Sequence, residues 1–274
     1  MGVARVRDPE KRRIAAQNRE MTAVMKQELR LWRAARRRQI PQWKQKLEQM
    51  VPGKARRGLE QAFGRGFSLI FSKGVGVIEK TYPKQDLQSD YAIRDYAFRL
   101  KGRRRELKQI RRGAGRLNLR NLTATTMEGV ALGLLGIGMP DVAVFLGVLF
   151  RGIYETALSY GFAYESPAEK LLILKMMEAA LSSGDDWARS NEQVDQMLVR
   201  EMADTTPAEL EEQIRRTAAA FSVELLLLKF IQGIPVAGVL GGAGNTVYYH
   251  RIMQYVQLKY RKRYLLKSSD AIKE

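Results

Sequence analysis

Residues 129–164 read GVALGLLGIGMPDVAVFLGVLFRGIYETALSYGFAY. Between Glu128 and Arg151 the only charged residue is Asp141, and Pro140-Asp141 divides the stretch into two apolar segments. Glycine recurs through both segments, and small residues let helix backbones approach closely. The stretch therefore predicts two apolar helical segments around which the rest of the chain is organised.

A second stretch, residues 230–250, has the same character and reads FIQGIPVAGVLGGAGNTVYYH, without a formal charge. We predict that the two stretches pack against each other, with helix contacts at small positions. The glycines that we expect to serve this packing are Gly133, Gly136, Gly238, Gly241 and Gly242.

The two stretches also raise the question of membrane insertion. Each reaches the ~20 residues that a membrane-spanning helix needs. Pro140 and Asp141 interrupt the first, and Pro235, Gln232 and Asn245 interrupt the second, so neither is a good straight span. A pair of buried core helices broken by a turn is the favoured interpretation, and a hairpin inserted in the bilayer is the alternative.

The charge of the chain is strongly basic and unevenly placed. The formal net charge is +18 and the isoelectric point is about 10.2. Residues 1–121 hold 32 Lys and Arg against 11 Asp and Glu, whereas residues 122–228 hold 7 against 16. An excess of this size predicts an acidic partner, which is either an anionic membrane surface or nucleic acid. The chain has no cysteine, which excludes disulfides and thiolate chemistry.

The order of helix signals predicts an all-α protein with one multi-helix domain. Residues 1–40 form a basic helical arm that is polar enough to be partly disordered on its own, residues 41–266 form the domain, and residues 267–274 form a tail. Ser166-Pro-Ala-Glu169 and Thr206-Pro-Ala-Glu209 are capping boxes, each with proline at the first helical position. The last helix is expected to run from Pro235 towards Leu266, and no alternating strand pattern of useful length occurs.

Signatures of catalysis are weak. His250 is the only histidine, and no nucleophile elbow, dinucleotide loop or phosphate-binding loop is present. The remaining candidates are carboxylates in apolar surroundings, namely Glu128, Asp141, Glu155 and Glu224. Structural roles explain them better, since Asp141 suits a helix start and Glu155 can pair with Arg151 one turn back. We expect no cofactor and no metal, and an enzyme acting on lipid or peptide is the second hypothesis.

Basic residues mixed with aromatic residues at both ends suit a membrane interface, where amphipathic rings lie at the headgroup level. The predicted membrane-binding residues are Trp32, Arg36, Arg37, Arg38, Trp43, Arg103, Arg104, Arg105, Tyr260, Arg261, Lys262, Arg263 and Tyr264. The same residues could bind phosphates of nucleic acid, which is the third hypothesis, although no nucleic-acid-binding motif supports it. Solvated basic helices are the plainest alternative.

The sequence resembles the EcsC family of bacterial proteins. The resemblance lies in Gly136-Ile-Gly-Met-Pro140-Asp141, in Ile153-Tyr-Glu155 through Gly161, in Pro167-Ala-Glu169, and in Lys229 through Asn245. It covers residues 43–265 and leaves the basic arm outside. It implies a helical protein without a settled activity and with no catalytic residues to carry over. The namesake of the family is encoded beside an ABC transporter, which implies proximity to a membrane.

We therefore expect a peripheral protein at the inner, cytoplasmic face of the plasma membrane. It would bind anionic lipid through its basic ends and could assist a transporter or another membrane complex. Because residues 1–39 are polar and lie outside the resemblance, we expect the fold to survive their removal.

Overall fold

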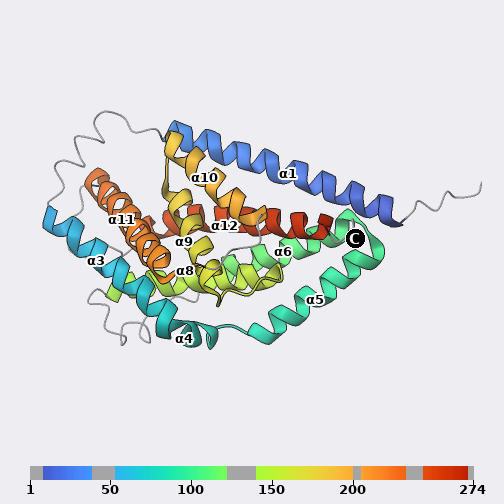
Figure 1. The fold of residues 1–274 in the computed structure, drawn as a ribbon, viewed down its shortest axis with the longest axis horizontal. Helices are drawn as coiled ribbons and strands as arrows, with labels where there is room; N and C mark the ends of the chain where they lie inside the picture. The colour runs from blue at the N-terminus through green and yellow to red at the C-terminus, as the bar shows by residue number, and fades with distance from the viewer. Residues whose placement is uncertain (1–8, 39–52, 122–139, 200–204, 233–242, 271–274) are drawn as a thin grey trace, which may run out of the picture.

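The computed structural model describes residues 9–38, 53–121, 140–199, 205–232 and 243–270, and every regular element in these ranges is a helix (Figure 1). The prediction of an all-α fold is confirmed. The elements are, in chain order, α1 (Pro9–Arg37), α3 (Gly53–Leu69), the π-helical turn η1 (Ile70–Gly74), α4 (Val75–Glu79), α5 (Lys84–Lys101), α6 (Arg104–Asn121), α8 (Pro140–Ser159), α9 (Pro167–Leu181), α10 (Gly184–Val199), α11 (Pro207–Gln232) and α12 (Ala243–Asp270).

The central helix is α8, which packs against α3, α5, α6 and α12. Within the described residues, Val142–Ser159 is the one stretch long and apolar enough to cross a membrane, and 89% of that window is buried inside the protein. In this structure the second half of the predicted apolar stretch is thus a core helix. The first half, residues 129–139, lies outside the described residues.

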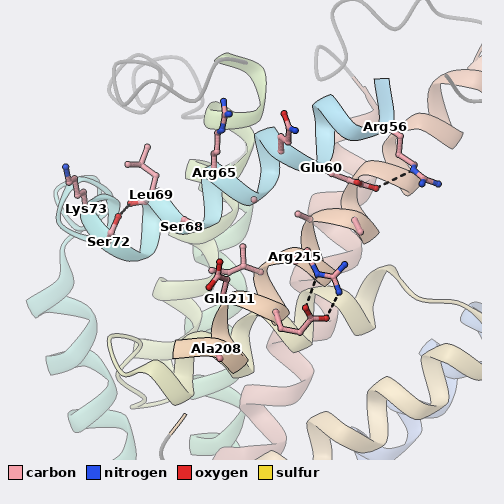
Figure 2. A pocket seen from close by; sticks show the side chains of 16 residues that line it. Arg56, Glu60, Arg65, Ser68, Leu69, Ser72, Lys73, Ala208, Glu211 and Arg215 are labelled. Atoms are coloured by element: carbon pink, nitrogen blue, oxygen red, sulfur yellow. Dashed lines mark hydrogen bonds and ion pairs between the residues drawn. The ribbon is translucent and has the colours of Figure 1, made fainter. Parts of the chain in front are cut away.

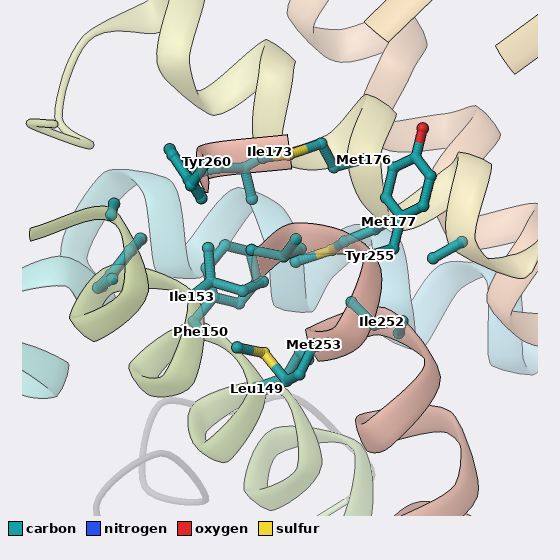
Figure 3. Packing of buried hydrophobic residues seen from close by; sticks show 14 of the residues in the cluster. Leu149, Phe150, Ile153, Ile173, Met176, Met177, Ile252, Met253, Tyr255 and Tyr260 are labelled. Carbon is teal, nitrogen blue, oxygen red and sulfur yellow. The ribbon is translucent and has the colours of Figure 1, made fainter. Parts of the chain in front are cut away.

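Side chains from three helices, α8, α9 and α12, meet around Phe150 of α8 (Figure 3). Figure 3 shows Phe150 and Ile153 of α8 close to Met177 of α9 and Met253 of α12, all of them buried. Further rings extend this packing into α3 and α11, and the ring centroids of Phe63 and Phe221 lie 5.0 Å apart. Each such side chain contributes roughly 1.5–3 kcal/mol when it leaves water, so this core is the main source of stability.

The capping box at Thr206 is complete, whereas at Ser166 only the hydroxyl cap is present, because the Glu169 carboxylate binds Tyr260 and Arg263. The amide of Glu169 donates to the Ser166 hydroxyl over 3.2 Å, and the amide of Glu209 donates to the Thr206 hydroxyl over 3.2 Å. The Glu209 carboxylate accepts from the Thr206 amide in return, at 2.9 Å. These bonds satisfy amides that would otherwise lack partners at the first turn, and they fix the starts of α9 and α11.

Two turns depend on glycines with positive φ. Gly102 ends α5 at φ +59°, and a side chain there would place its Cβ 2.9 Å from the carbonyl oxygen of Pro9. Gly161 ends α8 at φ +76°, and a side chain there would collide with the ring of Tyr91. Glycine is needed at both positions because other residues rarely adopt this backbone conformation and because no room exists for a Cβ.

Gly102 also separates two helices. The chain turns at Gly102, and α6 begins at Arg104 and continues through Gly113 to Asn121. Gly113 serves packing rather than bending, because a Cβ at this position would collide with the guanidinium of Arg94.

The basic arm is docked along the bundle. Helix α1 packs against α12, α10, α6 and α5, and Val24 and Ala35 are fully buried in these contacts. Figure 1 shows α1 lying beside α10 and α12 over most of its length. The predicted boundary at residue 40 therefore does not separate a free arm from a folded domain. The glycines Gly133, Gly136, Gly238, Gly241 and Gly242 lie outside the described residues, and their packing role stays a prediction.

Candidate membrane interface

The basic and aromatic run of α12, predicted to lie at a membrane surface, points into the bundle. Tyr260 and Tyr264 are buried, and their hydroxyls donate to Glu169 at 2.7 Å and to Asp95 at 2.8 Å. Arg263 binds the same Glu169 carboxylate at 2.7 Å. Burial removes Tyr260 and Tyr264 from the predicted membrane surface, and the ion pair commits Arg263 to an internal partner.

Lys259, the neighbour of this run, has a fully buried side chain and joins three helices. Its ammonium binds Glu28 of α1 and lies 2.6 Å from Asp195 of α10. Lys262 binds the same two carboxylates at 3.1 Å and 2.8 Å. Burial raises the pKa of Glu28, but the two lysines outweigh burial and hold this pKa at about 2. Burial lowers the pKa of Lys259, and its two carboxylate partners oppose that change.

Glu20 of α1 forms a second internal cluster. Its carboxylate is 1% exposed and binds Arg261 of α12 together with Arg104 of α6, the latter at 2.6 Å. Arg111 lies 3.6 Å away. Burial raises the pKa of Glu20, but the hydrogen bond from Arg104 and the charge of Arg261 outweigh burial and lower the pKa. Arg261 is therefore an interior residue, contrary to the predicted surface role, whereas Arg104 is 41% exposed and binds the buried carboxylate from the edge of the bundle.

These clusters decide which charges α1 presents to solvent. Its two internal carboxylates, Glu20 and Glu28, turn inward, and Glu10 in the first turn is its one exposed acid. The exposed basic residues of α1 are seven in number: Lys11, Arg19, Lys26, Arg30, Arg33, Arg36 and Arg37. The charged residues on the outward face of α1 are therefore almost all cations.

Apolar side chains share this outward face. Met25 is 61% exposed, Leu29 is 43% exposed and Ile14 is 41% exposed. Met25 and Leu29 are one turn apart, and Trp32 follows on the same side, half-buried with the Arg36 guanidinium 5.5 Å from its ring centroid. A cationic helix face with exposed apolar side chains is typical of helices that lie in a membrane interface. We call this surface, formed by the seven basic residues with Ile14, Met25, Leu29 and Trp32, the α1 outer face.

The remaining residues that were predicted to bind the membrane differ in their exposure. Arg36 and Arg37 are on the α1 outer face, whereas Arg38 is half-buried, and burial beside Arg251 lowers its pKa to about 10. Lys262 and Arg263 are partly buried in ion pairs, and Trp43 lies outside the described residues. Arg103 and Arg105 are exposed at the turn between α5 and α6.

A second exposed apolar stripe lies on α5. Ile93, Tyr96 and Leu100 follow the i, i+3, i+7 spacing and are each more than 60% exposed. Asp86 and Asp90 are exposed one to two turns before this stripe. These carboxylates make α5 less complementary to an anionic surface than α1.

The candidate catalytic carboxylates are held by arginines. Glu155 is buried and binds Arg151 at 3.2 Å, which is the pair that the sequence predicted. Glu224 binds Arg251 at 3.1 Å. Asp141 lies in the first turn of α8, as expected for a residue that suits a helix start, and Glu128 lies outside the described residues. In the described ranges no three Asp, Glu or His side chains gather as a metal site would require. We therefore assign no reaction to these residues.

Sequence reasoning missed the importance of α1 because its average composition is polar. A signal was present, since Glu20, Val24 and Glu28 are spaced by four residues and share one helix face. Two acids on the face of an apolar residue in an otherwise basic helix indicate buried ion pairs with another helix. The basic partners of these acids, on α6 and α12, could not be identified from spacing along the chain.

The fold and the surface together define a helical bundle whose first helix is pinned by internal ion pairs and presents a basic and apolar face. The chain belongs to the EcsC protein family, whose sequence profile matches residues 15–265. This match includes most of α1, which corrects the expectation that the basic arm lies outside the resemblance. Neither the curated proteins nor the solved structures contain a significant match to this chain.

Proposed function

We propose that this protein is a peripheral membrane protein that binds anionic bilayers through the α1 outer face. The observation that carries the proposal is the separation of charge on α1. Glu20 and Glu28 form ion pairs inside the bundle, and the seven exposed cations share the outward face with exposed Met25 and Leu29.

The magnitude of the attraction fits reversible binding. Each basic residue near an anionic leaflet contributes ~1 kcal/mol. Seven residues together give ~7 kcal/mol, which corresponds to a dissociation constant on the order of 10 µM. Shallow burial of Met25 and Leu29 adds to this binding and distinguishes it from purely electrostatic adsorption.

Nucleic acid is the competing acidic partner, because phosphates attract the same cations. The exposed apolar side chains on the α1 outer face favour lipid, since a duplex backbone offers them no apolar surface. Within this proposal the protein acts at the inner face of the plasma membrane. Assistance to a transporter or another membrane complex is suggested by the family resemblance.

The test is flotation with vesicles of phosphatidylcholine alone or mixed with phosphatidylglycerol. The wild-type protein should float with the anionic vesicles and be released by salt, which screens exposed charges. A triple variant with Lys26, Arg30 and Arg33 changed to Gln should lose affinity on the order of 100-fold, at ~1 kcal/mol for each charge.

The matched control removes three exposed charges from other elements, namely Lys54, Arg57 and Lys80, each changed to Gln. It should bind nearly as well as the wild type. An equal loss of affinity for vesicles in this control would show that binding depends on net charge alone and not on the α1 outer face. Equal binding to neutral vesicles, or complete displacement by duplex DNA without a preference for lipid, would overturn the proposal.

A further inference from the structure

A groove lies between α3 and the first half of α11, lined also by η1 (Figure 2). Its volume is about 1270 Å³. Sites for small molecules usually measure ~300–1,000 Å³ and are more enclosed. The size of the groove therefore favours a macromolecular surface over a metabolite.

The residues that line the groove repeat with the period of a helix. On α3 and η1 they include Gln61, Gly64, Ser68 and Ser72, and on α11 they include Glu211, Arg215 and Ala218. Spacings of three and four residues on both elements are those of helices that present one face to a further pair of helices. The described chain leaves this face of α3 and α11 uncovered.

Gly64 lies in the groove lining at a position where the fold does not require glycine. In the described residues, no atom lies within 4 Å of the place where its Cβ would stand. Glycine inside a helix is about 1 kcal/mol less favourable than alanine. A glycine that the chain itself does not require, next to Ser68 and opposite Ala218 and Ala219, suits close approach by another backbone.

The two rims of the groove carry opposite charges. Arg65 and Lys73 stand on the side of α3 and η1, and Glu211 stands on the side of α11, all three exposed. Among the described residues none of these three forms an ion pair. Arg56 and Arg215, by contrast, are bound to Glu60 and Glu212 of their own helices, as the dashed lines in Figure 2 show.

We propose that this groove binds a second copy of the same chain, related by a two-fold axis. A two-fold axis brings the same surface of both copies together, so the basic rim of each copy meets the acidic rim of the other. Arg65 of one copy then faces Glu211 of its partner, and the contact occurs twice. The four helices, two α3 and two α11, form a bundle across the interface.

Charge complementarity selects this occupant. A surface with only one sign of charge would repel its own copy, whereas this surface has both signs on separate rims. The groove is also independent of the proposed membrane contact, because α3 and η1 lie away from α1 in Figure 1. The dimer can therefore be tested without lipid.

The experiment is sedimentation equilibrium of the full-length protein over a range of concentrations in lipid-free buffer. The wild type should show a monomer–dimer equilibrium. Arg65→Glu and Glu211→Arg should each raise the dimer dissociation constant about tenfold or more, because each creates two repulsive contacts between exposed charges. The double variant, which restores opposite charges, should return to the wild-type constant.

Arg57→Glu is the matched control, because Arg57 is an exposed cation of α3 outside the groove lining. It should leave the equilibrium unchanged, and circular dichroism should show the same helicity for all variants. A wild-type protein that stays monomeric at all concentrations would overturn the inference. So would a dimer that ignores both single substitutions, or a double variant no stronger than the single ones. None of these outcomes bears on vesicle flotation.

Discussion

Glu20 illustrates how single residues hold this fold together. Its carboxylate is buried between Arg261 and Arg104, so it compensates cationic charge inside the protein. Burying an unpaired charge is far more unfavourable than exposing one, because the charge leaves water without a substitute. Loss of the Glu20 carboxylate would therefore leave the buried charge of Arg261 without a partner.

We expect Glu20→Gln to lower the free energy of unfolding by ~3–5 kcal/mol, because Arg261 would keep its charge without a carboxylate. Urea denaturation followed by circular dichroism measures this loss. Arg19→Gln, one residue away on the exposed side of α1, should change stability by no more than ~0.5 kcal/mol. A loss below ~1 kcal/mol for Glu20→Gln would mean that water or another group satisfies Arg261.

Glycines provide a second residue-scale prediction. Gly161→Ala should destabilise the protein by ~1–3 kcal/mol, because the backbone at Gly161 is left-handed and Tyr91 occupies the space of the new methyl group. Gly76→Ala should instead stabilise α4 by up to ~1 kcal/mol, because its Cβ has free space and alanine favours helix. Thermal melts of the two variants should shift in opposite directions.

At the scale of elements, the local signals in the sequence were sufficient for some helices. Ser166 and Thr206 marked the starts of α9 and α11 correctly, because capping depends on residues within one turn. The four-residue spacing of Glu211 with Arg215 and of Glu212 with Arg216 suits ion pairs within α11, but the structure forms neither of these pairs. Arg215 binds Glu212, and Arg216 binds Glu178 of α9 at 2.8 Å. Arg216 can pair with Glu212 one turn away or with Glu178 on another helix, and only the packing of the helices decides which pair forms.

Several residues that we predicted to bind a membrane surface are buried in the structure. Composition alone cannot distinguish a basic and aromatic helix face that contacts lipid from one that contacts buried carboxylates. Tyr260 and Arg261 therefore looked like surface residues until Glu169 and Glu20 were seen beside them. Met25 and Leu29 were missed because their exposure depends on which side of α1 docks. Burial of charge is a property of the assembled helices and cannot be derived from one helix alone.

The docking of α1 reverses the expectation that the fold survives its loss. Deleting residues 1–37 would leave Lys259 and Arg261 without their α1 carboxylates and would uncover the surfaces that Val24 and Ala35 bury. We expect a large fall in melting temperature, or loss of cooperative unfolding, measured by circular dichroism. An unchanged melting curve in the truncated protein would show that α1 is an independent arm after all.

For the whole molecule, the internal ion pairs determine the response to acid. The ordinary pKa of a glutamate is near 4.5, and that of Glu28 in the folded protein is about 2. A lowered pKa means that the unfolded chain binds the proton more tightly, so its stabilising effect is complete above pH ~4.5 and is lost as the pH falls towards 2.

The melting temperature should therefore be nearly constant from pH 7 to 5 and fall steeply below pH ~4.5. Glu20, whose pKa is also lowered, contributes to the same decline. Thermal melts at a series of pH values measure this, and Glu28→Gln should show lower stability at pH 7 with a shallower decline. A wild-type protein as stable at pH 3 as at pH 7 would contradict the described charge clusters.

The ion pairs of Glu20 and Glu28 also join residues that the ribosome makes at different times. Lys259 follows Glu28 by 231 residues, and Arg261 follows Glu20 by 241 residues. At roughly 5–20 residues per second, ribosomes deliver these partners about 10–50 seconds after α1 has been made. For that interval Glu20 and Glu28 of α1 lack their partners on α12, although Arg104, the α6 partner of Glu20, is made earlier. Under the proposed function, a nascent chain would present α1 to a bilayer before the bundle closes, and membrane binding and final folding would then be separate steps in time.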